Sequence, residues 1–71
     1  MRRDQIKKLT GIEMEIIHLA VQGLKNKEIA EEQKVAEITI KKAMSTIYRK
    51  LNISGRPELL TIFGEEKHEE E

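Results

Sequence analysis

Apolar side chains recur at helical spacing between residues 37 and 51, and this pattern constrains the fold more than any other feature of the chain. Ile40, Met44, Ile47 and Leu51 follow one another at i, i+4, i+7 and i+11, which places them on one face of a helix. Residues 37–51 are therefore predicted to form the longest helix. No alternating apolar and polar run bounded by turn residues indicates a strand, and 71 residues allow one small domain. The chain is predicted to be all-α.

A second helix is predicted to begin after Thr10. Thr10-Gly11-Ile12-Glu13 fits a capping box, in which the Thr hydroxyl and the Glu carboxylate each accept from a backbone amide. An apolar stripe follows at helical spacing, made by Ile16, Ile17, Ala20, Val21 and Leu24. Gln22-Gly23 is predicted to end the helix, because glycine enters the left-handed conformation without steric cost.

Two shorter helices complete the predicted set of four. One runs from Asn26, as its N-cap, to about Gln33. The other follows a turn at residues 52–55, carries Pro57 in its first turn and is predicted to stop at Gly64. Each is short, so packing against neighbouring helices has to hold it in place.

Charge divides the chain into three parts although its net charge is zero. Residues 1–8 are predicted to be a flexible basic segment, residues 9–63 a folded domain and residues 64–71 an acidic tail. Residues 1–63 carry twelve Lys/Arg against eight Asp/Glu, a balance of +4, whereas residues 64–71 carry one Lys against five Glu, a balance of −4. The basic part favours a polyanionic partner. One hypothesis for residues 64–71 is that the acidic tail occupies the basic face of the same molecule and so competes with DNA phosphates for it.

Composition excludes several other classes of function. There is no cysteine, and the two histidines, His18 and His68, belong to no recognisable catalytic or metal-ligand pattern. The four glycines are isolated, which argues against a nucleotide-binding loop. We therefore expect no enzyme, no metal and no cofactor. The sequence contains no signal peptide and no apolar run of membrane-spanning length, so a reduced, cytoplasmic location without a membrane partner is expected.

Residues 26–45 have the spacing of a helix-turn-helix. In this motif two helices cross closely, so that one position must be small and five must be apolar. Ala30 takes the small position, and four of the five apolar positions hold Ile29, Val35, Ile40 and Ala43. Gln33 stands at the fifth, where an aliphatic side chain is usual. The opposite face of residues 37–51 carries Ile38, Lys41, Lys42, Ser45 and Arg49. Such a face suits the major groove of DNA, and the alternative is an ordinary solvated surface.

Four blocks of sequence carry a resemblance to a known family. Residues 9–13 (LTGIE), 23–30 (GLKNKEIA), 39–41 (TIK) and 47–56 (IYRKLNISGR) follow, in order and spacing, the DNA-binding domain of the LuxR/FixJ/GerE type. The resemblance covers residues 9–63 and implies a four-helix domain whose third helix is the recognition helix. It also implies a bacterial transcriptional regulator that binds duplex DNA sequence-specifically. Because no sensing domain fits in this length, the chain is expected to be either a free-standing regulator or the output module of a larger one.

By position, the resemblance assigns three sets of site residues. The base-reading set is Lys41, Lys42 and Ser45; the phosphate-contacting set is Asn26, Lys27, Thr39, Arg49 and Lys50. The fourth helix would pair two domains as a homodimer on inverted half-sites, through Leu59, Leu60 and Phe63, although for any one of them a place in the core is favoured over the interface.

Departures from the family pattern keep a second function open. Ala36 stands where a serine usually caps the recognition helix, and Lys25 where a Ser or Thr usually precedes the second helix. Losing such a cap typically costs ~1 kcal/mol. Glu31 and Glu32 make the second helix acidic. The alternative function is therefore a protein-interaction module of helix-turn-helix fold that has lost DNA binding and contacts RNA polymerase or another regulator.

Overall fold

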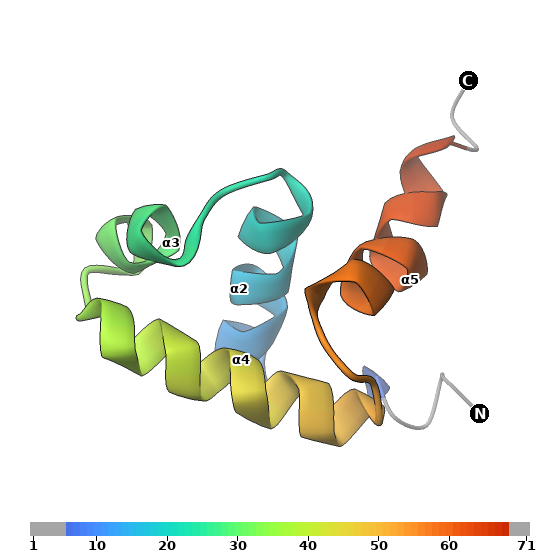
Figure 1. Ribbon diagram of the computed structural model, residues 1–71, viewed down its shortest axis with the longest axis horizontal. Helices are drawn as coiled ribbons and strands as arrows, with labels where there is room; N and C mark the ends of the chain where they lie inside the picture. The colour runs from blue at the N-terminus through green and yellow to red at the C-terminus, as the bar shows by residue number, and fades with distance from the viewer. Residues whose placement is uncertain (1–5, 69–71) are drawn as a thin grey trace.

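A computed structural model describes the backbone of residues 6–68 and the side chains up to residue 64 (Figure 1). It contains the four predicted helices: α2 (Gly11–Val21), α3 (Asn26–Gln33), α4 (Glu37–Leu51) and α5 (Arg56–His68). No strand occurs within the described residues, and the prediction of an all-α fold is confirmed. Residues 1–5 and 69–71, which belong to the predicted basic segment and acidic tail, lie outside the described part of the chain.

The longest helix, α4, runs along one edge of the molecule, and the other helices pack on its inner side (Figure 1). The closest-packed pair is α3 and α4, while α2 contacts all three of the other helices. At the opposite end of α4 from α3 the chain turns back into α5, which packs against α2. This arrangement leaves one long face of α4 without a neighbouring element.

One core is shared by all four helices. Its buried residues are Ile16, Ile17, Ala20, Ile29, Ala30, Ile40, Met44, Ile47, Leu51 and Leu59. The predicted stripe of α4 is confirmed, because all four of its members are at most 3% exposed. Burial of these aliphatic side chains is what holds helices of 8 to 15 residues in place.

The capping box predicted at the start of α2 and the glycine turn predicted at its end are both confirmed. The amide of Glu13 donates to Thr10 Oγ1 (3.2 Å), and the amide of Thr10 donates to Glu13 Oε1 (2.8 Å), which completes the capping box. The helix ends at Val21, and Gly23 takes a φ of +102°. Leu24, predicted in the stripe of α2, therefore lies beyond the helix, where it still packs against the core.

Three local predictions are wrong. Asn26 is the first helical residue of α3, not its N-cap; Lys25 takes the cap position, and the Glu28 carboxylate accepts from the Lys25 amide (2.8 Å). Helix α5 continues through Gly64 to His68, because an isolated glycine only weakens a helix. Val35 remains 43% exposed: it lies in the turn after α3, outside the packed faces.

The turn between α3 and α4 depends on a residue that the sequence analysis did not single out. Lys34 adopts the left-handed conformation (φ 61°, ψ 45°). The amide of Val35 donates to the carbonyl of Ala30 (3.0 Å), which satisfies a carbonyl at the end of α3. A left-handed residue reverses the chain within three residues, so α4 can start directly against α3.

Within the described residues, no helix is long and apolar enough to cross a membrane.

Candidate nucleic-acid interface

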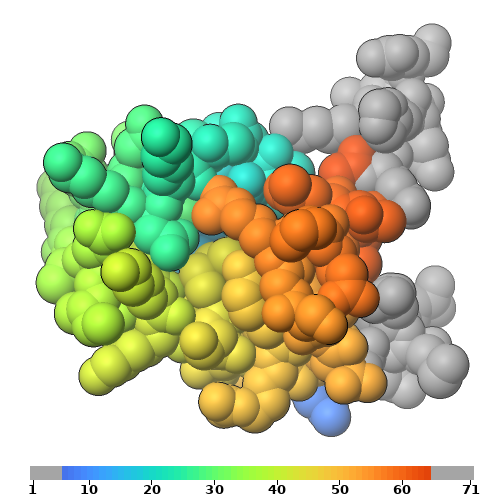
Figure 2. All heavy atoms as spheres, in the orientation of Figure 1, coloured from blue at the N-terminus to red at the C-terminus, as the bar shows by residue number. Residues whose placement is uncertain are grey.

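The unpartnered face of α4 is exposed along its length. Its members are Ile38, Lys41, Lys42, Ser45 and Arg49, and all five are exposed. They lie on the opposite side of the helix from the buried stripe, and the space-filling view shows α4 at the surface from its start beside α3 to its end beside α5 (Figure 2). The structure thus brings together all three predicted base-reading residues, Lys41, Lys42 and Ser45, on one accessible surface, which we call the α4 face.

Close packing with α3 determines how the α4 face is presented. Ile29 and Ile40 are at most 1% exposed, and Ala30 is 4% exposed in the small position. A larger side chain at residue 30 would force the helices apart, because protein cores are packed at crystal-like density. Gln33, at the position where an aliphatic side chain is usual, is half-buried.

The N-terminus of α4 lacks a side-chain cap, as the sequence predicted. Ala36 is the N-cap and makes no side-chain hydrogen bond. The Thr39 amide donates back to the Ala36 carbonyl (3.0 Å). The other first amides of a helix have no intrahelical acceptor and favour anions, and the Ala36 side chain offers them none.

The predicted phosphate-contacting residues fall into two groups. Lys27, Thr39 and Arg49 are exposed. Asn26 is half-buried, and its Oδ1 accepts from Arg56 Nη1 (3.4 Å), so its side chain is engaged within the domain. The first group remains available to an external anion.

Lys50, predicted to contact phosphate, forms an ion pair within the domain. Its Nζ lies 2.8 Å from Glu13 Oε1 and 3.0 Å from Glu13 Oε2, and the Glu13 side chain is only 10% exposed. Burial raises the pKa of Glu13, but the hydrogen bond from Lys50 and the backbone hydrogen bond from Thr10 outweigh it, so the pKa lies below its ordinary value. Lys50 is thus held by a carboxylate of α2 and joins the end of α4 to the start of α2.

Arg56 is a structural residue to which the sequence analysis assigned no role. Its guanidinium donates to the carbonyls of Ala20 (3.3 Å) and Leu24 and to Asn26 Oδ1. One side chain at the start of α5 therefore binds the end of α2, the following loop and the start of α3. The only sequence signal was its place in the family block at residues 47–56, which does not reveal partners 30 to 36 residues away.

The predicted dimer residues of α5 do not share one environment. Leu59 is fully buried in the core of this domain, so the prediction that it faces a second domain is wrong. Phe63 is half-buried and packs against the same core. Leu60 is 39% exposed and remains accessible to a partner.

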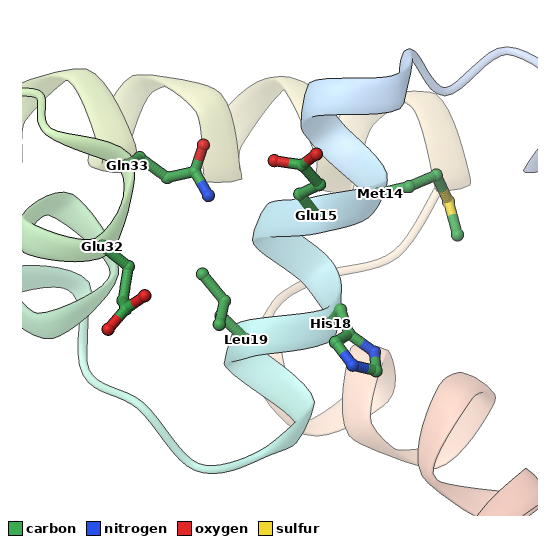
Figure 3. A pocket seen from close by; sticks show the side chains of 6 residues that line it. All are labelled: Met14, Glu15, His18, Leu19, Glu32 and Gln33. Atoms are coloured by element: carbon green, nitrogen blue, oxygen red, sulfur yellow. The ribbon is translucent and has the colours of Figure 1, made fainter.

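A shallow groove of about 460 Å³ lies between α2 and α3, away from the α4 face. It is lined by Met14, Glu15, His18, Leu19, Glu32 and Gln33. Figure 3 shows Leu19 and Gln33 directed toward each other across the space between the two helices, with Glu15 and Glu32 at its sides. His18 is exposed. Within the described residues, no three His, Cys, Asp or Glu side chains gather closely enough to hold a metal ion.

Two helices joined by a tight left-handed turn, with a small residue at their contact and a basic exposed second helix, define a helix-turn-helix domain of the DNA-binding kind. Residues 7–63 match the family described as bacterial regulatory proteins, luxR family. The chain therefore belongs to the luxR family, as its sequence blocks indicated, and is a DNA-binding domain of transcription regulation.

Curated relatives include much longer regulators. The nitrate/nitrite response regulator protein NarP of Escherichia coli is 33% identical over 64 residues, which cover 90% of this chain and 30% of NarP. The HTH-type transcriptional regulators MalT of Vibrio campbellii and Vibrio parahaemolyticus are each 40% identical over 52 residues, 73% of this chain and 6% of MalT. The chain thus spans less than a third of the length of these relatives.

Proposed function

We propose that this domain binds duplex DNA sequence-specifically by placing α4 in the major groove. The observation that carries the proposal is the two-sided character of α4: one face is buried to within 3% exposure, and the other presents Lys41, Lys42 and Ser45 to solvent. The major groove admits an α-helix, and each base pair shows there a distinct pattern of donors and acceptors. No catalytic role belongs to the proposal.

Base and phosphate contacts are divided along α4. Lys41 and Lys42 can donate to guanine O6 and N7, and the Ser45 hydroxyl can donate or accept. Arg49, Thr39 and the first turn of α3, at Asn26 and Lys27, contact the phosphates beside the groove. Asn26 contacts phosphate through its backbone amide, because its side-chain oxygen accepts a hydrogen bond from Arg56. Lys50 is left out of this set, since Glu13 holds its ammonium.

The proposal also includes a homodimer on inverted half-sites, acting on DNA in the bacterial cytoplasm. Helix α5 would supply the contact through the exposed Leu60, with the edge of Phe63 beside it. Two-fold pairing of such domains sets the spacing between half-sites at about one helical turn of DNA or a multiple of it. Any contact with RNA polymerase or another regulator would add to DNA binding rather than replace it.

Selection from a random duplex pool at moderate salt, followed by sequencing of the retained DNA, tests the proposal. Enrichment of an inverted or single half-site motif would support it, and the spacing would show whether the domains pair. Retention without enrichment would contradict sequence-specific recognition. No retention even at low salt would contradict DNA binding altogether and favour the protein-interaction module.

Alanine variants then separate base contacts from phosphate contacts. Lys41→Ala and Lys42→Ala should each relax the preference at one base position, at a cost of about 1–3 kcal/mol. Arg49→Ala should weaken binding to all sequences alike and reduce the slope of log K against log salt by about one. Lys27→Ala, on α3, is a second phosphate variant with the same expected effect. If Lys41→Ala, Lys42→Ala and Arg49→Ala all leave binding unchanged, the α4 face is not the interface.

A further inference from the structure

One side chain of the α4 face has no polar chemistry to offer a base. Ile38 is 56% exposed, whereas the four apolar residues on the other side of α4 are buried. It precedes Lys41 by three residues and Lys42 by four, so the three side chains are neighbours on the helix surface. An isolated exposed isoleucine is unremarkable on a protein surface, but this one lies inside a surface otherwise formed by Lys, Ser and Arg.

The position of Ile38 is close to the start of the recognition helix. It is the second residue of α4, which begins at Glu37, and the side chains of a helix lean toward its N-terminus. The N-terminal residues of a recognition helix are the ones that contact base edges. Docking α4 in the groove would therefore bring Ile38 against the bases together with Lys41.

An aliphatic side chain matches only one feature of the major groove. The edges of guanine, adenine and cytosine present acceptors and donors, and covering them with an aliphatic group would leave those polar atoms unpaired. Thymine alone carries an apolar group there, its C5-methyl. We propose that Ile38 is a specificity-determining residue, which packs against the C5-methyl of a thymine next to the bases contacted by Lys41 and Lys42. This inference rests on the proposed function.

Replacing thymine by deoxyuridine removes the C5-methyl and leaves the base pairing intact, so it tests the contact directly. The probe is the most enriched duplex from the selection, with each thymine of the half-site replaced in turn and Kd measured by fluorescence anisotropy. At one position, the native chain should lose about three- to fivefold in affinity, the value of one buried methyl group. Ile38→Ala should bind the thymine duplex with the same loss and should not respond to deoxyuridine at that position.

Control variants keep this test independent of folding. Ile38 is outside the core, and alanine has the higher helix propensity, so Ile38→Ala should fold. Ile38→Val should retain most of the response to the methyl group. Ile12→Ala removes an equally exposed isoleucine (58%) from α2 and should respond to deoxyuridine as the native chain does.

Three results would overturn the inference: no thymine in the selected half-site, no position at which deoxyuridine weakens binding, or the same weakening in the native chain and in Ile38→Ala. In each of these cases the enriched motif itself would still stand, and with it the proposed function. An absence of any retained duplex in the selection would instead refute both.

Discussion

The ion pair between Glu13 and Lys50 should contribute measurably to the stability of this domain. Ion pairs on a protein surface are worth about 0–1 kcal/mol, whereas hydrogen bonds to charged groups contribute about 1.5–3 kcal/mol when they are shielded from water. Here Lys50 Nζ donates to both carboxylate oxygens, and the side chains are 28% and 10% exposed. The geometry lies between the two limits, and we expect a coupling free energy of about 1–2 kcal/mol.

A double-mutant cycle measures this coupling free energy, because the effects of the other contacts of each residue cancel. Glu13→Gln keeps an oxygen that can accept from the Thr10 amide, and Lys50→Met keeps the aliphatic stem. Lys50→Met should be the more destabilising single change, because it leaves a shielded carboxylate without its counter-charge. The free energies of unfolding come from urea titrations of both single variants and the double variant. For a domain of this size each 1 kcal/mol shifts Tm by about 4–8 °C.

The exposed Glu15 on the same helix provides the matched control, and Glu15→Gln should change stability by less than about 0.5 kcal/mol. A coupling below about 0.3 kcal/mol, the error of additivity for independent sites, would refute the structural role of the pair. Lys50→Met should also leave the salt dependence of DNA binding unchanged. A slope reduced by about one would instead restore Lys50 to the phosphate contacts.

The pH dependence of the same pair has a definite sign. The pKa of Glu13 is lower in the folded chain than its ordinary value of 4.5, so the folded state favours the ionised carboxylate. The stabilisation is therefore complete above pH 4.5 and is lost as the pH falls through the lowered pKa. Below pH 4.5 the difference in stability between the native chain and Glu13→Gln should shrink, whereas a constant difference would contradict the assignment.

Three further substitutions test the helix ends. Lys34→Gly should raise the free energy of unfolding by up to about 1 kcal/mol, measured as a higher Tm, because a left-handed conformation strains any residue with a Cβ. Lys34→Ala is the control and should gain nothing. Ala36→Ser supplies the missing cap of α4 and should stabilise by about 0.5–1 kcal/mol in urea titrations, an expectation that an unchanged midpoint would contradict. Arg56→Lys keeps the charge but not the planar array of donors, so it should lose about 1–2 kcal/mol by the same assay; equal stability would show that charge alone suffices there.

Local patterns in the sequence were enough to predict the helices and the helix-turn-helix unit. The bounds of α4, its buried stripe and the capping box of α2 all follow from patterns among residues three to eleven positions apart, because helical periodicity determines which side chains share a face. The exposed α4 face followed from the same periodicity. For this reason the predicted base-reading residues lie together on one surface.

Contacts between distant residues were decided only by the tertiary structure. Lys50 and Glu13 are 37 positions apart, and Arg56 reaches acceptors 30 to 36 positions away, so no local pattern distinguishes these cations from those free to meet phosphate. Leu59 and Leu60 are adjacent, yet one is fully buried and the other 39% exposed. Because composition along α5 offers apolar residues on several sides of the helix, only its packing against α2 selects which of them enters the core and which stays accessible to a partner.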